Sequence, residues 1–300
     1  MTVLITGATG LIGTAVTKKC LDAGWNVHYL STGKDKIKSL SNLKGFYWNP
    51  EAHEIDTAAF SGVTVIINLV GAPVTKYWSA QYKKVILNSR IESTKLIFKT
   101  LQNMEHEVNH FISASGISVY PDSKTKLYSE EDAEIGTSFL AGVVVEWEKA
   151  ANDFKQLGID VAIVRTGLVL DGKGGALAEM IKPIKLGLGA NLASGTQWQS
   201  WIHIADVVGI YFQILTNELE GVYNAVAPNP VTNNKLTKQI ANQLKRPIWL
   251  PNIPAAFLRL IFGEMAGILI ESKMVSSKKI EQHSYDFQYK SIEAALEDLL

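Results

Sequence analysis

The feature that most constrains this chain is a glycine-rich segment near its beginning, Thr6-Gly7-Ala8-Thr9-Gly10-Leu11-Ile12-Gly13. An apolar run precedes it, and apolar residues recur after it at helical spacing as far as Ala23. The first glycine permits a tight turn, the second lets backbone N–H groups approach a phosphate, and the third lets the helix pack on the strand. A helix N-terminus also attracts anions. The segment therefore predicts a strand–turn–helix unit that binds the diphosphate of a dinucleotide.

Short apolar runs alternate with helical patterns along the first half of the chain. The runs lie at Val3–Thr6, Val27–Leu30, Val65–Leu69, His110–Ser113 and Val161–Arg165. Continuous apolar runs of this length are typical of parallel strands that are buried on both faces. The alternation predicts an α/β fold with a Rossmann-type doubly wound parallel sheet and right-handed crossovers.

The sequence changes character after Arg165. Residues 167–195 are rich in glycine, and prolines interrupt short segments from Pro228 to Pro254. A strand-like stretch at Gly221–Ala225 follows a helical one. We therefore expect residues 1–170 to form the dinucleotide-binding domain, with 200–230 returning to it. Residues 171–199 and 231–300 should form a smaller, loop-rich C-terminal substrate lobe.

Composition excludes several other classes of protein. The chain has 29 basic and 29 acidic residues, so its net charge gives no reason to expect nucleic acid or a membrane as a partner. Cys20 is the only cysteine and the six histidines show no ligand spacing, so no disulfide and no metal site are expected. The apolar stretch 253–270 contains Arg259 and Glu264, which favours a buried or amphipathic helix over a membrane span. With no targeting segment visible, the expected location is cytoplasmic.

The residues after the second strand bear on the choice of cofactor. An acidic residue at this place would bind the ribose hydroxyls of NAD. The chain instead has Ser31, Thr32, Gly33 and Lys34, with no acid before Asp35. Hydroxyl groups and a cation suit a 2′-phosphate, so NADP(H) is favoured over NAD(H). The alternative is that Lys34 is an ordinary solvated loop charge.

Two cations lie on the apolar side of a long helix predicted over 79–101. Lys83 and Arg90 project there together with apolar residues such as Ile86. A buried cation is costly unless an anion meets it, so a cofactor phosphate or an acidic substrate group is expected nearby. The alternative is an internal ion pair, or long side chains that reach solvent. Function is favoured for Arg90, because a guanidinium suits bidentate binding of an oxyanion.

An ordered set of motifs recurs along nearly the whole chain. It resembles the short-chain dehydrogenase/reductase superfamily, in its extended branch, and most closely the atypical subgroup called the epimerase family. The resemblance implies a Rossmann cofactor domain with a small C-terminal lobe over the cofactor. The motifs are the T-G-A-T-G-L-I-G turn, Asn68-Leu69-Val70-Gly71-Ala72-Pro73, Ser89-Arg90, Ser113-Ala114-Ser115, Trp147-Glu148, Arg165-Thr166-Gly167-Leu168, Gly174-Gly175-Ala176-Leu177, Ser200-Trp201-Ile202-His203 and Asn224-Ala225 with Ala227-Pro228-Asn229-Pro230.

The resemblance also implies where the cofactor lies. The glycine turn would line the diphosphate, residues 31–34 would lie near the adenosine ribose, and residues 69–71 would lie on the adenine side. Many relatives have an arginine at about Thr32, which this chain lacks. Many relatives pair through long helices, so the resemblance is compatible with a homodimer. The expected cofactor-binding residues are Gly7, Thr9, Gly10, Leu11, Ile12, Gly13, Ser31, Thr32, Lys34, Leu69, Val70, Gly71 and Arg90, with Ser113, Ala114, Arg165 and Gly167 at the nicotinamide end.

The usual catalytic residues of the superfamily are absent. Typical members use a serine and a Tyr-x-x-x-Lys pair, in which the tyrosine exchanges a proton while hydride moves at the nicotinamide. Ser115 has a suitable position for the serine. One alignment of the helix puts Leu140 and Val144 at the tyrosine and lysine positions, and another puts Val145 at the tyrosine position. The atypical subgroup shares this loss, so any acid or base must come from elsewhere.

Other side chains could supply the proton. Tyr120 follows Ser115 in the same loop, although a packing role is somewhat favoured for it. Lys83 becomes a base if burial lowers its proton affinity. His203 is a further candidate, but its sequence context favours a helix cap. The catalytic candidates are therefore Ser115, Tyr120 and Lys83.

Two functional hypotheses remain. The first is an NADP(H)-dependent, epimerase-like oxidoreductase that acts on a small, anionic or nucleotide-linked substrate. The second is a non-catalytic NADP(H)-binding redox sensor or partner-binding scaffold, which the missing Tyr-x-x-x-Lys pair motivates directly.

Overall fold

A central parallel sheet organises the molecule, and the computed structural model describes all of residues 1–300. Its strands follow the order β13-β9-β7-β6-β1-β2-β4, and each neighbouring pair is parallel. The strand order reverses beside β1, as in doubly wound dinucleotide-binding folds. The bounds are β1 Thr2–Thr6, β2 Asn26–Ser31, β4 Leu43–Asn49, β6 Val65–Asn68, β7 His110–Gly116, β9 Asp160–Thr166 and β13 Gly221–Ala225; the short β3 Ser39–Leu40 and β5 Glu54–Ile55 pair antiparallel with β4.

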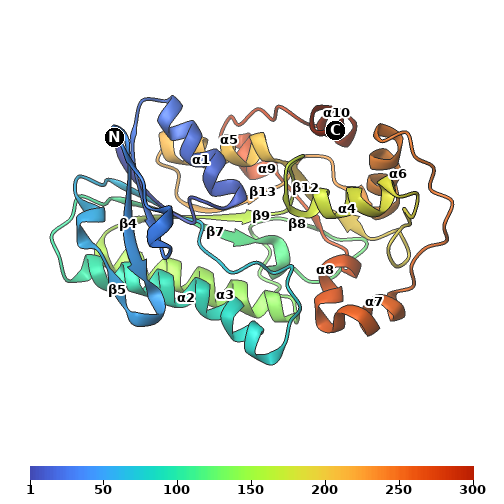
Figure 1. Cartoon of the computed structure of the whole chain (residues 1–300), viewed down its shortest axis with the longest axis horizontal. Helices are drawn as coiled ribbons and strands as arrows, with labels where there is room; N and C mark the ends of the chain where they lie inside the picture. Colours follow the sequence, from blue (N-terminus) through green and yellow to red (C-terminus); the bar gives the residue numbers. More distant parts are fainter.

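Helices cover both faces of this sheet (Figure 1). Helices α1 (Leu11–Asp22) and α5 (Ile204–Thr216) lie on one face, and α2 (Ala80–Gln102) and α3 (Phe139–Asn152) lie on the other. Successive side chains of a strand point to opposite faces. Val3 and Ile5 of β1 therefore belong to the core under α1 and α5, while Leu4 belongs to the core under α2. This double burial explains why the strands are apolar runs.

A second, smaller group of elements lies beyond the carboxyl end of the sheet, on the right in Figure 1. Strands β10 and β12 pair in parallel here, and a separate apolar core includes Leu177, Trp201, Leu236 and Leu296. We call this group the small lobe. Its elements are β10 Leu168–Leu170, α4 Gly175–Lys185, β11 Trp198–Gln199, β12 Trp201–His203, β14 Val231–Thr232, α6 Asn233–Gln243, α7 Ala255–Phe262, α8 Gly267–Ile270 and α10 Ile292–Leu299.

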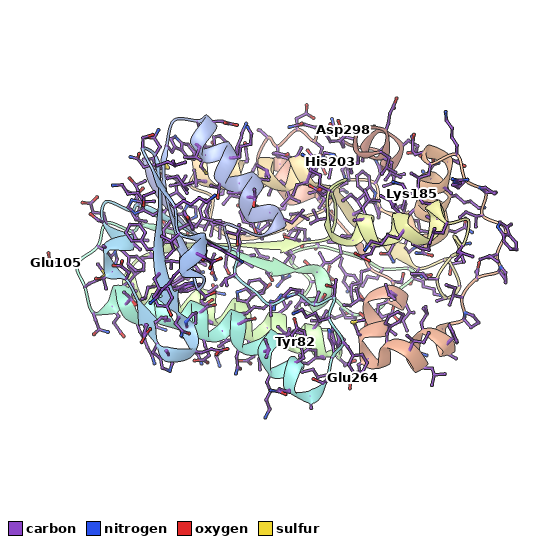
Figure 2. The ribbon with its side chains drawn as sticks, in the orientation of Figure 1. Tyr82, Glu105, Lys185, His203, Glu264 and Asp298 are labelled. Atoms are coloured by element: carbon purple, nitrogen blue, oxygen red, sulfur yellow. The ribbon has the colours of Figure 1, made fainter.

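The remaining short elements connect the two parts. Strand β15 (Met274–Val275) pairs in parallel with β8 (Leu127–Tyr128), which follows β7 along the chain. Helix α9 (Lys278–Gln282) contacts β13. In Figure 2, Lys185 of the small lobe and Glu105 beyond α2 mark opposite ends of the molecule. The chain thus returns from the small lobe to the large sheet more than once.

Two features differ from the sequence-based expectation. Strand β4 was not predicted, because its sequence, LKGFYWN, mixes Lys, Gly and Asn with aromatic residues and forms no continuous apolar run. The apolar stretch 253–270 is not one helix but α7, a 3-10 turn (Gly263–Ala266) and α8. None of the helices combines the length and the apolar character needed to cross a membrane.

Candidate active site

The glycine turn has the geometry that an anion site requires. Gly7 has a φ of 67°, and a Cβ there would lie 2.8 Å from the Leu69 carbonyl group. A Cβ on Gly13 would lie 2.1 Å from the Gly7 oxygen, so the close packing of helix on turn excludes any side chain. Gly10 is the N-cap residue of α1, and no side chain caps the helix. The free N–H groups of the first helical turn are therefore available to a ligand.

The end of β2 carries hydroxyls and a lysine beside the turn. Ser31 is buried and its hydroxyl donates to the Gly33 carbonyl at 3.1 Å, while Thr32 is exposed. A 3-10 turn (Lys34–Lys36) follows, and Lys34 Nζ lies over the Tyr47 ring at 4.8 Å from its centroid. This contact holds a cation at the carboxyl end of β2, where no carboxylate pairs with it.

Arg90 is a partly buried cation without a carboxylate partner. Its Nη1 donates to the carbonyls of Ile86 at 2.9 Å and Ala72 at 3.3 Å, and the guanidinium lies 5.0 Å from the centre of the Trp147 ring. Burial lowers the pKa of Arg90 to about 10, so the group is still charged at neutral pH. A Cβ on Gly71 would lie 2.8 Å from Arg90 Cζ. The guanidinium therefore lies directly against the loop that follows β6.

Lys83 pairs with a carboxylate of the protein and does not face a site for an external anion. Its ammonium pairs with Glu264 of the small lobe and lies over the Phe139 ring at 5.1 Å. Figure 2 shows Glu264 close to Tyr82, at the N-terminal end of α2. Of the two expectations for Lys83, the geometry favours the internal ion pair. A lysine held in this way is a contact between the two parts of the molecule rather than a free base.

The Ser115 hydroxyl is engaged in a buried network. It donates to Glu148 Oε1 at 2.6 Å, and Arg165 donates to both oxygens of Glu148 at 2.8 Å. The Arg165 and Glu148 side chains are only 11% and 13% exposed. Burial opposes the charge of Arg165, but the hydrogen bonds and charge of Glu148 raise its pKa overall. Ser115 and Arg165 therefore join β7, β9 and α3, and neither lines the pocket described below.

Tyr120 belongs to the same network. It is fully buried, and its hydroxyl donates to Asn224 Oδ1 at 2.8 Å and accepts from Arg165 Nη1 at 3.0 Å. Burial raises the pKa of Tyr120, against the opposing charge of Arg165. Tyr120 does not line the pocket, so this geometry favours the packing alternative over a direct catalytic role.

A large pocket lies between the sheet edge and the small lobe. Its volume is about 1000 Å³. Thr166, Gly167 and Leu168, at the carboxyl end of β9, form its floor, and α7 and α8 contribute one wall. Gly167 is the one residue of the predicted site that lines it. Its aromatic and charged lining residues are Trp78, Phe139, Trp198, Asp122, Glu264, Glu271, Lys124, Arg259 and Lys273.

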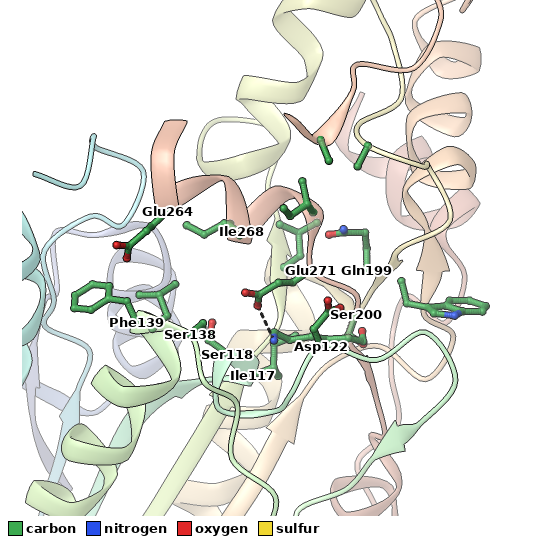
Figure 3. Close-up of a pocket in the computed structure, with 18 of the residues that line it drawn as sticks. Ile117, Ser118, Asp122, Ser138, Phe139, Gln199, Ser200, Glu264, Ile268 and Glu271 are labelled. Carbon is green, nitrogen blue, oxygen red and sulfur yellow. Dashed lines mark hydrogen bonds and ion pairs between the residues drawn. The ribbon is translucent and has the colours of Figure 1, made fainter. Parts of the chain in front are cut away.

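Sequence reasoning missed the polar residues that face this pocket. Ser118, in a 3-10 turn just after β7, lines it and its hydroxyl makes no hydrogen bond within the protein. Lys273 Nζ donates to the Tyr120 carbonyl at 2.7 Å and pairs with Glu271 at 2.8 Å. Figure 3 shows the Glu271 carboxylate pointing into the pocket, toward Ser118 and Asp122. The sequence places Ser118 three residues after Ser115, and only Ser118 lines the pocket.

His203 and the nearby tryptophans have structural surroundings. His203 is the N-cap residue of α5, and its Nδ1 accepts from the Ala205 N–H at 3.1 Å. Its Nε2 lies 3.2 Å from Asp298 of α10. Trp201 is fully buried in the core of the small lobe, whereas Trp198 lines the pocket. Of these three side chains, only Trp198 is placed to contact a small molecule.

The fold and the site together define a doubly wound, dinucleotide-binding class of protein with a substrate-sized pocket at the carboxyl edge of its sheet. A model of the NAD dependent epimerase/dehydratase family matches residues 3–225, and a domain of unknown function matches residues 253–299. The chain therefore belongs to the NAD dependent epimerase/dehydratase family, as the resemblance of its motifs indicated.

Individual relatives span the whole chain. An epimerase family protein of Staphylococcus epidermidis is 32% identical over 99% of this chain and 98% of its own length. A chloroplastic SDR39U1 homolog of Arabidopsis thaliana is 34% identical over 100% of this chain and 87% of its own length.

Solved structures share the fold. The human epimerase family protein SDR39U1 with NADPH is 29% identical and superposes with a TM-score of 0.86, covering 100% of this chain and 99% of that one. A UDP-glucuronic acid 4-epimerase from Bacillus cereus, solved with UDP-glucuronic acid and NAD, has a TM-score of 0.80 over 100% and 98% of the two chains. At 16% identity, the second comparison shows the fold alone.

Proposed function

We propose that this chain is an NADP(H)-dependent oxidoreductase that acts on a small-molecule substrate held between the sheet and the small lobe. The observation that carries the proposal is the pocket of about 1000 Å³ at the end of β9, on the sheet edge that also bears the glycine turn. Only β6 and β7 separate β9 from β1, so one dinucleotide can extend from the turn to the pocket. The human relative with NADPH supports the same cofactor here.

The residues present fit this cofactor. The uncapped N-terminus of α1 would bind the diphosphate, and Gly7 and Gly13 allow the tight turn and the close helix packing that present it. Ser31, Thr32 and Lys34 would bind the 2′-phosphate of the adenosine ribose. Arg90, a cation with no carboxylate partner, would contact the cofactor beside Gly71. When bound, the nicotinamide supplies or accepts a hydride at the floor of the pocket.

The side chains that line the pocket limit the class of substrate that it can hold. Three acidic and three basic side chains face it, and two of the acids already pair with lysines. Asp122, the third, accepts a hydrogen bond from the Ser272 N–H. Aromatic rings at Trp78, Phe139 and Trp198 supply flat apolar surface. This balance suits a polar carbonyl or hydroxyl compound of low net charge better than a strongly anionic one.

The test begins with cofactor binding. We expect NADPH to quench the protein's tryptophan fluorescence at lower concentration than NADH. Lys34→Ala should weaken NADPH binding about tenfold, roughly 1.4 kcal/mol, and leave NADH binding unchanged. Lys44→Ala, which removes an exposed charge from the neighbouring strand β4, is the matched control and should change neither. Equal affinity for the two cofactors in the native chain contradicts the assignment.

A turnover assay distinguishes the enzyme hypothesis from the redox-sensor hypothesis. The proposal predicts NADPH oxidation with at least one compound in a panel of ketones, aldehydes and nucleotide sugars. If NADPH binds and none of them is reduced, the non-catalytic redox sensor becomes the better account. That alternative has a specific basis, because the apolar Leu140 and Val144 occupy the helix positions where typical members have the tyrosine and the lysine.

A further inference from the structure

Lys273 is the pocket cation that the protein holds most firmly. Its side chain is only 11% exposed, whereas Lys124 and Arg259, the other two cations that line the pocket, are exposed. Its ammonium uses one N–H on the Tyr120 carbonyl and another on Glu271. An ammonium has three N–H donors, so one remains for a ligand in the pocket. The two bonds fix the position of that third donor.

The same residue is tied to the ends of two central strands. The Lys273 carbonyl accepts from the Ser200 hydroxyl at 2.9 Å, and the Ser200 carbonyl accepts from the Leu168 N–H at 2.8 Å. Leu168 begins the segment that follows β9. On the other side, Tyr120 follows the 3-10 turn that carries Ser118 after β7. Lys273 is thus anchored on both sides of the pocket floor, where the proposed function places the nicotinamide.

No other well-placed proton donor lines this part of the pocket. Leu140, at one aligned position of the missing tyrosine, lines the pocket but is apolar. Glu264 is committed to Lys83, and its side chain is 67% exposed. Ser118 can donate a hydrogen bond but is far too weak an acid to give up its proton alone. Lys273 therefore combines burial, a fixed position and a transferable proton.

We propose that Lys273 is the catalytic proton donor of the reduction, and that Ser118 hydrogen-bonds the same substrate oxygen; this inference rests on the proposed function. As hydride reaches the carbonyl carbon, the C=O π pair moves onto the oxygen. An N–H bond of Lys273 breaks and an O–H bond forms, which yields the alcohol. The resulting amine regains a proton from water on the side of Glu271, whose carboxylate stabilises the ammonium. The net change is C=O plus NADPH plus a proton to CH–OH plus NADP⁺.

The first test measures binding without cofactor. Phenanthrenequinone, an aromatic dicarbonyl, should quench tryptophan fluorescence from Trp78 and Trp198. Lys273→Ala should weaken this quenching about tenfold, because a charge-assisted hydrogen bond to the carbonyl oxygen is lost. Lys273→Arg keeps a donor and should bind within about threefold of the native chain. Lys278→Ala, which removes an exposed cation outside the pocket, is the matched control and should bind like the native chain.

The second test measures reduction of phenanthrenequinone, diacetyl and benzaldehyde by NADPH. Lys273→Ala should lower kcat about 100-fold or more, the usual contribution of a positioned acid. Lys273→Arg should keep KM within about threefold but still lose kcat, because a guanidinium does not release its proton readily. Ethylammonium in the buffer should restore part of kcat to Lys273→Ala and leave kcat of Lys278→Ala unchanged. NADPH affinity, measured well below the melting temperature of each variant, should match that of the native chain.

Two results overturn the assignment of Lys273. One is a Lys273→Ala or Lys273→Arg variant whose kcat stays within about threefold of native. The other is a native chain that binds NADPH yet reduces none of the three probes. Failure of the native chain to bind NADPH is a different result, because it removes the proposed function itself.

Discussion

The two ends of the proposed cofactor cleft are built in different ways. At β1, one continuous stretch of eight residues, from Thr6 to Gly13, makes the turn, the helix start and the close packing. At β9, the pocket is lined by residues that range from Trp78 to Lys273 and come from both parts of the molecule. The first site is local in sequence and recognisable as a motif. The second exists only when distant segments meet, so its residues carry no shared spacing.

This contrast predicts that a substitution in the glycine turn weakens cofactor binding and leaves the pocket unchanged. Gly13→Ala places a Cβ where 2.1 Å separates it from the Gly7 oxygen, so the helix must move away from the turn. We expect NADPH affinity to fall more than about tenfold and the free energy of unfolding to fall by roughly 2 kcal/mol. Fluorescence titration and urea denaturation measure the two effects.

Gly142→Ala is the matched control for that substitution. Gly142 lies in α3, its φ is negative, and a Cβ there meets nothing within 4 Å. The alanine should leave NADPH binding unchanged and stabilise the chain by about 0.5–1 kcal/mol, because glycine disfavours a helix interior. If Gly13→Ala binds NADPH as tightly as Gly142→Ala, the turn is not the diphosphate site.

The opposite experiment disturbs the pocket end and spares the turn. Glu148→Gln leaves the Arg165 guanidinium buried with no carboxylate partner, and it weakens the bond from Ser115. The free energy of unfolding should fall by about 2–3 kcal/mol, since breaking a buried ion pair costs more than losing an exposed one. NADPH affinity, measured well below the melting temperature, should stay near native.

Glu146→Gln controls for loss of charge on the same helix. Glu146 is exposed and makes no ion pair, so the change should alter stability by less than about 0.5 kcal/mol. Equal stability of the two variants would mean that the Arg165–Glu148 pair does not hold the strand ends together.

The smallest expected effect is the pH dependence of stability, to which His203 contributes beside Asp298 of α10. Burial lowers the pKa of His203, against the opposing charge of Asp298, and burial also lowers the pKa of His110. The unfolded chain takes up these protons near its ordinary histidine value, while the folded chain takes them up only at lower pH. Stability is therefore complete above about pH 6.5 and falls as the pH drops below it.

Urea denaturation between pH 7.5 and 5.5 measures this loss. His203→Gln should be less stable than native at pH 7.5, by about 1 kcal/mol, because the Nδ1 cap on Ala205 is lost. Its stability should then decline less steeply with falling pH than that of the native chain. An identical slope in both proteins would exclude His203 as a source of the pH dependence.

Local patterns were enough to predict most of the sheet and one end of the site. Strands β1, β2, β6, β7 and β9 were expected within three residues at each end, because burial on both faces requires continuous apolar runs. The alternation of these runs with helical patterns predicted the Rossmann-type fold, and the ordered set of motifs along the chain indicated the family. Strand β4 escaped prediction because its partial exposure removes that signal.

Side-chain partners could not be predicted in the same way. The spacing of Lys83 and Arg90 correctly indicated two cations on an apolar helix face, but not that Glu264, far along the chain, pairs with one of them. The serine pattern after β7 did not indicate that Ser115 faces Glu148 while Ser118 faces the pocket. Which serine faces the pocket depends on the backbone conformation of a few residues at the end of β7.

The sequence by itself therefore determined the parallel sheet and the glycine turn, since each arises from neighbouring residues. Only the tertiary structure decided which polar groups face the pocket. Lys273 reaches the Tyr120 carbonyl across 153 positions of the chain, and Ser200 anchors it across 73. Contacts of that separation form after the chain has folded back on itself, and no local pattern of residue types encodes them.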